Sequence, residues 1–252
     1  MLPLTGKTVL VTGGSRGIGA ATVKAVAAQG GRVVLHYGQS RSEAEALQAA
    51  IGRERCLLVQ ADLAETEAAE QLWKDSLAAA SRINVLINNA AIFADAPIDM
   101  AVEDWRAAWH EVLQVNLMAP AELCRLAIEH FRQHGGGKII NVASRAAHRG
   151  EAPDQWPYGA SKGALVTLTK TIARGFAKEN VLAFAIAPGF TETDMVTGAL
   201  NQEQIARVVA DIPLGSMASP EECGALAAFL CSDAVRHMTG ATFDINGASY
   251  VR

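Results

Sequence analysis

The chain has 252 residues, half of them hydrophobic and 19% charged, which is ordinary for a globular α/β protein. Its formal net charge of −4 gives no electrostatic reason to expect a nucleic acid partner. No apolar run approaches the ~20 residues that span a bilayer, and the residues before the first expected strand are too few for a signal peptide. We therefore expect a cytoplasmic protein that binds neither membrane nor nucleic acid.

The four cysteines (Cys56, Cys124, Cys223 and Cys231) form no CxxC pair and lack the spacing of a disulfide-rich chain. Their expected role is that of small buried hydrophobic side chains in a reducing compartment. Metal ligation is the alternative, but no cluster of histidine and cysteine supports it, so we expect no metal site.

Short β-branched runs alternate with longer amphipathic or alanine-rich segments along the whole chain. Several of the short runs, such as 85–87 and 183–186, are almost continuously apolar, which is typical of parallel strands buried on both faces. The expected strands are 7–12, 32–36, 56–59, 84–88, 138–142, 181–186 and 242–245. The expected helices are 17–29, 42–51, 66–80, 102–134, 158–178 and 220–231.

This alternation predicts βαβ units with right-handed crossovers. The expected fold is a doubly wound, Rossmann-type parallel sheet of about seven strands with helices on both faces. No linker, charge block or repeat interrupts the pattern, and the glycines at 135–137 form only a short loop. The prediction is one domain over residues 1–252.

The first expected strand runs directly into a glycine-rich turn, Gly13-Gly14-Ser15-Arg16-Gly17-Ile18-Gly19, and a helix follows at once. Glycines at such a turn let backbone N–H groups approach a pyrophosphate, and the helix dipole adds favourable potential for the anion. A glycine-rich turn alone is weak evidence, because turns use glycine for its conformational freedom. Its place in the first βα turn of a doubly wound sheet is what favours dinucleotide binding.

The loop spacing, Gly13-x-x-x-Gly17-x-Gly19, differs from the common GxGxxG, and other motifs follow it in a fixed order. These are Asp62-Leu63, Asn88-Asn89-Ala90-Ala91, Asn116, Ser144, Tyr158-x-x-x-Lys162 and Pro188-Gly189. Over essentially the whole chain the sequence resembles the short-chain dehydrogenases/reductases. The resemblance implies an oxidoreductase that moves a hydride between a nicotinamide cofactor and a carbonyl or alcohol.

The glycine loop and the resemblance together predict which residues contact the cofactor. They are Gly13, Ser15, Arg16, Gly17, Ile18, Gly19, His36, Tyr37, Ser40, Arg41, Asp62, Leu63, Asn89, Ala90, Ala91, Tyr158, Lys162, Pro188, Gly189 and Thr191. By the same likeness, Asp62 and Leu63 flank the adenine, Asn89 lies beside the ribose, and Asn88 is mainly structural.

The end of the second strand bears on the choice between NADP and NAD. In a dinucleotide fold an acidic residue there accepts from the ribose 2′-hydroxyl and repels a 2′-phosphate. This chain reads His36-Tyr37-Gly38-Gln39-Ser40-Arg41, with no carboxylate before Glu43. Arg16 and Arg41 can both reach that corner, and arginine pairs well with phosphate. We predict NADP(H), with NAD(H) as the alternative.

Tyr158 and Lys162 are four residues apart on an expected helix and therefore share a face. A phenol with a pKa of about 10 is a poor acid–base catalyst at neutral pH unless its anion is stabilised. A cation one helical turn away provides that stabilisation. The pair alone is moderate evidence, because an amphipathic surface helix can carry it by chance.

The remaining members of the catalytic set come from the resemblance. Ser144 follows the fifth expected strand, at the carboxyl edge where ligands bind in open sheets, and its hydroxyl can hold the substrate oxygen. Asn116 interrupts an apolar run, so its amide needs a buried partner. The family uses that asparagine to hold a water in a proton relay from the lysine, whereas its structural alternative is a helix kink.

Within the family the segments 189–195 and 239–247 are similar to the β-ketoacyl-acyl carrier protein reductases. Glu179, however, stands where those reductases carry an arginine that docks the acidic carrier protein, and it would repel such a partner. The stretch after Ser144 is one residue longer than usual, and Phe184 and Ala91 replace a usual asparagine and glycine. The substrate therefore stays open between a carrier-bound thioester and another small carbonyl compound or alcohol.

Two further alternatives remain. His36-Tyr37-x-x-Ser40 is similar to the pteridine reductases, although those usually lack the serine at 144. A non-catalytic NADP(H) sensor is the alternative of another class, but a sensor has no need of an activated phenol. The resemblance also implies a homotetramer, formed through the helices 102–134 and 158–178 and the last strand.

Overall fold

A single parallel sheet organises the chain in the computed structural model, which describes residues 2–198 and 200–251 and, at 195 and 197, only the backbone. Its strands are β1 (Thr8–Val11), β2 (Arg32–Tyr37), β3 (Cys56–Gln60), β4 (Val85–Asn88), β5 (Gly137–Val142), β6 (Val181–Pro188) and β7 (Thr242–Ile245). They lie in the order β3-β2-β1-β4-β5-β6-β7, and all neighbouring pairs are parallel. The predicted doubly wound fold is confirmed, with strand ends within two residues of those expected.

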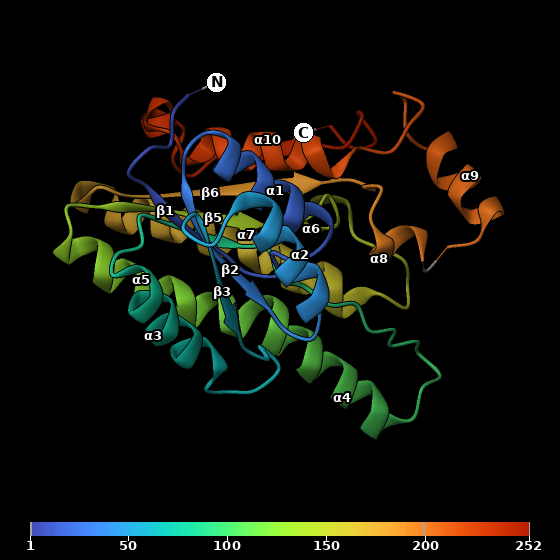
Figure 1. The fold of residues 1–252 in the computed structure, drawn as a ribbon. Coiled ribbons are helices and arrows are strands. Elements are labelled where there is room, and N and C mark those ends of the chain that lie inside the picture. The colour runs from blue at the N-terminus through green and yellow to red at the C-terminus, as the bar shows by residue number, and fades with distance from the viewer. Residues whose placement is uncertain (1, 199, 252) are drawn as a thin grey trace.

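The strand order reverses between β1 and β4. The chain runs outward from β1 to β3 and then returns, so that β4 pairs with the other edge of β1. In open α/β sheets, ligands bind at the carboxyl ends of the strands at this switch point. The glycine loop leaves β1 and the Asn88-Asn89 motif leaves β4, so both motifs meet there (Figure 1).

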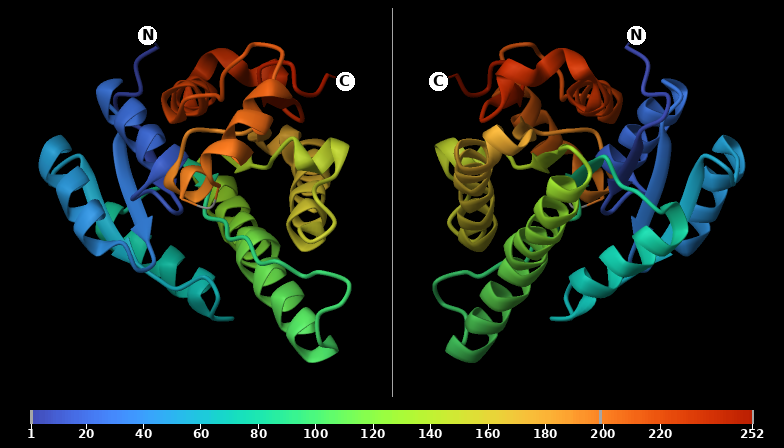
Figure 2. Two further views of the ribbon diagram at one scale, coloured as in Figure 1. Left: turned by 90° about the vertical axis from the view of Figure 1, so that its right-hand side faces the viewer. Right: turned by 90° about the vertical axis from the view of Figure 1, so that its left-hand side faces the viewer.

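Helices cover both faces of the sheet (Figure 2). One face packs against α1 (Gly17–Ala28), α2 (Arg41–Ile51) and α10 (Pro220–Cys231), and the other against α3 (Ala68–Ala80), α5 (Ala119–Gln133) and α7 (Trp156–Phe176). Val9 and Val11 point into the first core while Leu10 points into the second. The strands are mostly apolar on both sides because both of their faces are buried.

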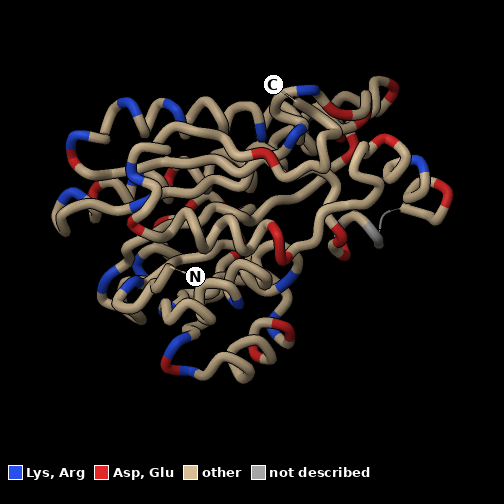
Figure 3. The backbone as a smooth tube through the Cα atoms, turned by 90° about the horizontal axis from the view of Figure 1, so that it is seen from above, with Lys and Arg blue, Asp and Glu red and all other residues tan. Residues whose placement is uncertain are grey.

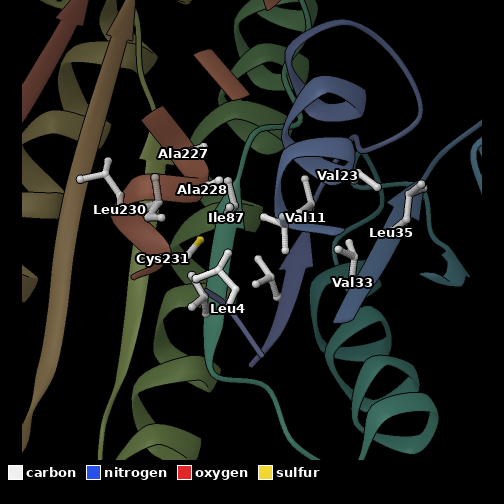
Figure 4. Packing of buried hydrophobic residues seen from close by; sticks show 14 of the residues in the cluster. Leu4, Val11, Val23, Val33, Leu35, Ile87, Ala227, Ala228, Leu230 and Cys231 are labelled. Carbon is white, nitrogen blue, oxygen red and sulfur yellow. The ribbon is translucent and has the colours of Figure 1, made fainter. Parts of the chain in front are cut away.

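The first core is tightest where α1 meets α10. A Cβ on Gly224 would lie 2.7 Å from the backbone of Ala21, so only glycine allows the two helices to approach this closely. Val11, Val33 and Leu35 of the sheet pack beneath this contact (Figure 4). The packing fixes α1, and with it the glycine loop at its start.

The expected helix 102–134 is present but is not α-helical throughout. It consists of α4 (Val102–Leu113), a π-helical segment (Gln114–Met118) and α5, joined end to end. The expected helix 158–178 begins earlier, as α7 at Trp156 with Pro157 in its first turn, and continues into a 3₁₀ turn at Ala177–Glu179. The helices α6 (Ala146–Arg149), α8 (Asp194–Thr197) and α9 (Gln202–Ala210) and the 3₁₀ segment Asp233–Met238 were not expected from the sequence.

Helices α8 and α9 lie beyond the carboxyl edge of the sheet, at the right of Figure 1. None of the nine residues of α9 is buried. Acidic and basic residues are interspersed over the outer elements (Figure 3). Within the part of the chain that the structure describes, no helix is long and apolar enough to cross a membrane.

Candidate active site

The glycine loop forms a shallow cradle at the start of α1. Gly13 and Gly17 have φ angles of +61° and +51°, which residues with a side chain rarely adopt. A Cβ on Gly19 would lie 2.0 Å from the carbonyl oxygen of Gly13. Helix α1 has no acidic residue in its first turn and no side-chain cap among the described residues, so its positive end faces the cradle. The geometry fits a dinucleotide pyrophosphate, and the predicted residues Ser15, Arg16 and Ile18 lie in the same turn.

Asn89 and Thr12 lock this loop to the end of β4. The Asn89 amide donates to the carbonyl oxygens of Thr12 (2.9 Å) and Gly13 (3.0 Å). The Thr12 hydroxyl in turn accepts from the backbone N–H groups of Asn89 (2.9 Å) and Ala90 (3.0 Å). Asn89 therefore holds the cradle in shape, and Ala90 and Ala91 follow it half-buried at the same strand end.

His36 supports the loop from the end of β2. Its Nδ1 accepts from the Gly13 N–H at 3.1 Å, so the proton lies on Nε2, which contacts the carbonyl oxygen of Ala61 at 3.0 Å. The ring is only 3% exposed, and burial lowers its pKa to about 4. The neutral imidazole ties β1, β2 and β3 together beneath the cradle. Direct contact between His36 and a cofactor stays a prediction.

The corner expected to face the ribose 2′-position lies between the starts of α1 and α2. Arg16 and Arg41 are both exposed there, and Ser40 is half-buried just before α2. Arg41 forms an ion pair with Glu45 at 2.8 Å. Hydrogen bonds from its own backbone and from Ser42 lower the pKa of Glu43, and the Arg16 charge adds to the effect. Tyr37 differs from these residues because its side chain is buried in the first core.

The other predicted cofactor residues lie on the same edge of the sheet. Asp62 caps the turn after β3 by accepting from the Ala64 N–H at 3.1 Å, and Leu63 is buried in the second core. Gly189 follows β6 and lies so close to Asn246 that a Cβ would be 2.8 Å from the Asn246 side chain. Thr191 is buried, and its hydroxyl donates to the Gly189 carbonyl oxygen at 3.2 Å. Pro188 and Gly189 thus present backbone to the site.

Asn116 lies in the π-helical segment, fully buried. Its amide clamps both backbone groups of Ile92: Oδ1 accepts from the N–H at 2.9 Å, and Nδ2 donates to the carbonyl oxygen at 3.0 Å. Nδ2 also lies 3.3 Å from the hydroxyl of Ser161, which donates to the carbonyl oxygen of Tyr158. The extra residue of a π-bulge turns the asparagine inward, a common device at functional sites. Asn116 therefore links the loop after β4 to the first turn of α7.

Tyr158 lies in that first turn, and its hydroxyl is hydrogen-bonded to Ser144, which follows β5. Ser144 is buried, and its Oγ accepts from the Ala146 N–H at 3.1 Å. Burial raises the pKa of Tyr158 to about 12, and the bond to Ser144 offsets only part of that rise. The phenol therefore keeps its proton at neutral pH and can donate it.

Lys162 lies one turn further along α7, only 2% exposed. Its Nζ donates to the carbonyl oxygen of Val142 at 2.8 Å and lies 5.6 Å from the centre of the Tyr158 ring. Burial lowers the pKa of Lys162 to about 7. The ammonium is thus poised near neutrality beside the phenol, and a phenolate at Tyr158 would stabilise the charged form.

Several residues of the site were missed by the sequence analysis. Phe93 is 40% exposed and stacks on Tyr158, with ring centres 3.9 Å apart. Ser161 joins Asn116 to Tyr158, as described above. Arg145 is buried directly after Ser144. Two of the residues that complete the site carried a signal in the sequence: Thr12 precedes the first glycine of the loop, and Ser161 lies three residues after Tyr158 on the expected helix. Phe93 and Arg145 join the site only in the folded chain.

Asn88, expected to be mainly structural, is buried away from the cradle. Its amide donates to Asn141 Oδ1 at 2.9 Å, and Asn141 donates to the Thr169 hydroxyl at 2.9 Å. This polar chain connects β4, β5 and α7 beneath the site. It keeps the strands that carry Ser144 and Asn89 in a fixed position relative to the helix that carries Tyr158.

The chain is similar to known proteins over nearly its whole length. A family described as Enoyl-(Acyl carrier protein) reductase matches residues 13–248. The 3-oxoacyl-[acyl-carrier-protein] reductase of Synechocystis sp. is 41% identical, covering 98% of each chain. The chain belongs to the short-chain dehydrogenase/reductase family.

Solved structures of this oxidoreductase family share the fold. A protein of Beutenbergia cavernae, assigned as an NAD(P) dependent gluconate 5-dehydrogenase and holding NADP at low occupancy, superposes with a TM-score of 0.88 at 34% identity, covering 98% of each chain. The 3-ketoacyl-(acyl-carrier-protein) reductase of Brucella melitensis, complexed with NADH, gives the same TM-score at 28% identity over 98% of this chain and 100% of the other. The resemblance drawn from the motifs is confirmed.

Proposed function

We propose that the protein is an NADP(H)-dependent oxidoreductase that interconverts a small carbonyl compound and an alcohol, with Tyr158 as general acid and base. The observation that carries the proposal is the hydrogen bond between the Tyr158 and Ser144 hydroxyls, with Lys162 buried beneath the same ring. This cluster lies at the carboxyl edge of the sheet, where the glycine cradle opens. Structural relatives that hold NADP or NADH support the assignment.

When bound, the reduced nicotinamide supplies the hydride that adds to the carbonyl carbon. The carbonyl oxygen then gains negative charge, which the Ser144 hydroxyl stabilises by a hydrogen bond. Tyr158 donates its proton to that oxygen, and the Lys162 ammonium stabilises the phenolate that remains. In the reverse direction the phenolate accepts the proton of the alcohol. Burial keeps Tyr158 protonated, which favours the donor role.

Asn116 supports this chemistry by position. Its amide holds the backbone of Ile92, and through Ser161 it steadies the turn that carries Tyr158. The relay role of the family asparagine, in which a water connects the lysine to solvent, is consistent with Asn116 and Lys162 lying on adjacent elements. We assign both roles to Asn116.

For the cofactor we propose NADP(H) rather than NAD(H). No carboxylate precedes Glu43 after β2, so nothing at that strand end accepts a ribose 2′-hydroxyl and repels a 2′-phosphate. Arg16 and Arg41 are exposed at the same corner. Their guanidinium groups are suited to a phosphate, which they bind through paired N–H donors.

The test measures the rate at which NADPH absorbance decreases when the protein is given β-ketoesters, ketones or quinones as substrates. We expect turnover in the wild type and its loss in Tyr158→Phe, by about three orders of magnitude, with cofactor binding retained. Ser76, a buried serine outside the site, provides a control for general damage in Ser76→Ala. Undiminished turnover in Tyr158→Phe would show that another group handles the proton.

A second candidate is a reductase of 3-oxoacyl thioesters on an acyl carrier protein, because such an enzyme is 41% identical. At the rim where the resemblance expects a docking arginine, Glu179 forms an ion pair with Arg132. The pair neutralises both charges, so it offers no net attraction to an acidic carrier protein. Comparing KM for acetoacetyl groups on coenzyme A and on a carrier protein tests this: a carrier-dependent enzyme shows a much lower KM for the second.

We also propose a cytoplasmic homotetramer, formed through α4, α5, α7 and β7. Exposed apolar side chains along the long helix, Val102 and Met118 among them, are consistent with burial against another copy. Light scattering coupled to size exclusion measures the assembly. A monomer at micromolar concentration would contradict the proposal.

A further inference from the structure

Arg145, directly after Ser144, is an arginine in an unusual place. It is only 4% exposed, whereas arginine is almost never fully buried unless it is paired. Its backbone N–H donates to the carbonyl oxygen of Pro188 at 2.8 Å. The residue is thereby fixed between the carboxyl ends of β5 and β6, next to Ser144 in the chain and to Pro188, one of the predicted cofactor contacts.

The Arg145 guanidinium has few partners for a buried charge. One face lies over the Phe190 ring, 4.6 Å from its centre. The nearest carboxylate oxygen, Oδ2 of Asp211, is 3.8 Å from Nη1, which is too far for a hydrogen bond. Among the described residues, Nη1 has no hydrogen-bond acceptor at all.

Asp211 does not satisfy Arg145, because it already has other partners. Its Oδ2 accepts a hydrogen bond from Arg149 Nη1 at 3.1 Å. The Asp211 side chain is 59% exposed, so water screens much of its charge. Arg149, part-exposed on the outside, is therefore the arginine to which Asp211 is hydrogen-bonded, and Arg145 beneath it has only the longer ion pair at 3.8 Å.

Holding such a charge is unfavourable for the folded protein. A buried guanidinium loses hydration, and an unsatisfied donor adds to the cost. Burial lowers the pKa of Arg145, and the Arg149 charge lowers it further, while Glu151 and Asp211 act in the opposite direction. Arginine nevertheless stays protonated in proteins, so the cation persists beside Ser144. An anion entering the site would remove this cost.

We propose that Arg145 binds a carboxylate of the substrate, so that the enzyme acts on oxo acids or hydroxy acids. This inference rests on the proposed function and narrows its substrate class. Because Arg145 directly follows Ser144, the substrate carboxylate must be separated from the carbon that exchanges the hydride by no more than about the length of an arginine side chain. A carboxylate fits better than a phosphate, because a single guanidinium balances a single negative charge. One face of that guanidinium is already covered by Phe190, so only its edge can bind the anion.

The first test compares oxo acids with their methyl esters, which keep the carbonyl and lose the charge. The acids are chosen with the carboxylate one to four carbons from the carbonyl. In the wild type we expect kcat/KM for the preferred acid to exceed that for its ester. In Arg145→Met the acid-to-ester ratio falls roughly 10- to 100-fold, mainly through KM of the acid.

Two matched variants separate binding from anchoring. Arg149→Met removes the neighbouring arginine and leaves Arg145 in place, so it keeps the acid-to-ester ratio. Asp211→Asn removes the one carboxylate within 4 Å of the Arg145 guanidinium among the described residues, and the acid then binds as tightly as before or more tightly. If Asp211→Asn reproduces Arg145→Met, the arginine only anchors the end of α9 and the proposal is wrong.

A second measurement does not depend on turnover or on one variant. Calorimetry measures the binding of butyrate, which has no carbonyl to reduce, to the protein saturated with NADP⁺. The wild type binds it, Arg145→Lys binds it more weakly because the planar fork is lost, and Arg145→Met does not bind it. Butyrate binding with no turnover of any oxo acid or neutral carbonyl supports the carboxylate site and contradicts the proposed function. Butyrate binding unchanged in both variants overturns the inference, as does a wild-type preference for phosphorylated ketones or for esters.

Discussion

The two sides of the site, the cofactor cradle and the substrate side, satisfy their polar groups in different ways. On the cradle side the side chains of Thr12, His36, Asn89 and Asn116 are all bonded to backbone groups of the fold. Each of them joins two segments that lie more than 20 residues apart in the sequence. The result is a cradle whose shape is set before any ligand arrives.

The substrate side is built from side chains that the fold leaves exposed to solvent or without a hydrogen-bond partner. Phe93 and Trp156 are large apolar side chains at the surface, and α9 buries none of its residues. Arg145 is buried but lacks a hydrogen-bond acceptor at Nη1 among the described residues. We infer from this contrast that the polar groups which hold the cofactor cradle already have all their hydrogen-bond partners within the protein. Substrate specificity, in contrast, comes from groups that gain a partner only when a ligand binds.

The largest effect is expected at Lys162. This side chain is as fully buried as the groups of the cradle, but its charge acts on the reaction rather than on the stability of the fold. Lys162→Met removes the cation beneath the phenol, and we expect kcat for reduction to fall about 1000-fold at saturating cofactor. In the wild type, kcat falls as pH rises through about 7, because the buried ammonium, whose pKa is lowered to about 7, then loses its proton.

Lys162→Arg provides the control, because arginine stays charged throughout the range. Its kcat is lower than that of the wild type, but the decrease near pH 7 disappears. A wild-type rate that is flat across neutrality would show that Lys162 is not the group that titrates.

Asn116 tests the cradle side by removing a clamp. Asn116→Ala deletes both hydrogen bonds to Ile92 and leaves its buried backbone groups without partners. We expect the free energy of unfolding to fall by about 4 kcal/mol and the thermal midpoint by roughly 10 °C. Because the loop that carries Phe93 is released, kcat falls as well.

Asn88→Ala is the matched variant, since it also removes a buried amide but leaves the Ile92 clamp intact. It is expected to be destabilised with a smaller loss of kcat. Equal losses of kcat in the two variants, at equal stability, would show that the clamp has no special part in catalysis.

His36 makes the stability of the cradle depend on pH in the acid range. Its folded-state pKa is about 4 against an ordinary 6.5, so the unfolded chain binds the proton more readily between these values. Stability is therefore full above pH 6.5 and decreases as pH falls toward 4. The difference of about 2.5 pH units, at 1.36 kcal/mol per unit, amounts to about 3 kcal/mol.

His36→Gln tests this, because the glutamine amide can still donate to Ala61 and does not titrate. Urea unfolding between pH 7 and pH 4 is expected to show a shallower loss of stability in the variant. His110→Gln, at an exposed histidine of α4, is the control. The same slope in His36→Gln and the wild type would assign the acid sensitivity to other groups.

The sequence was sufficient for the sheet and for the cradle, because both depend on local patterns. The apolar runs of β1 and β4 mark strands buried on both faces, and the glycines mark the turn between β1 and α1. For Asn116 the sequence predicted only that its buried amide needs a hydrogen-bond partner. That partner is the backbone of Ile92, and the contact depends on the π-helical segment that turns Asn116 inward. Such a segment barely changes the spacing of apolar residues, so the sequence pattern does not reveal it.

The substrate side was not predictable for a different physical reason. An arginine after a strand is typical of a solvated loop, and only the packing of Phe190 over Arg145 buries it. Helix α9 has a short apolar stripe, Ile205, Val208 and Val209, that the sequence interpretation passed over, and the fold only half-buries it. Phe93 meets Tyr158 across 65 residues of sequence, a contact that only the closed fold creates.

The smallest expected effect concerns the cofactor corner, where exposed charges are screened. Arg16→Gln is expected to lower the NADPH-to-NADH ratio of kcat/KM by roughly tenfold, and Arg41→Gln by less, because Arg41 already pairs with Glu45. Glu45→Gln frees Arg41 and should raise the ratio slightly. Added salt reduces all three differences, since these groups lie at the surface. If neither arginine variant changes the ratio, the preference for NADP(H) must come from backbone and hydroxyl groups such as that of Ser40, and the exposed arginines have no part in it.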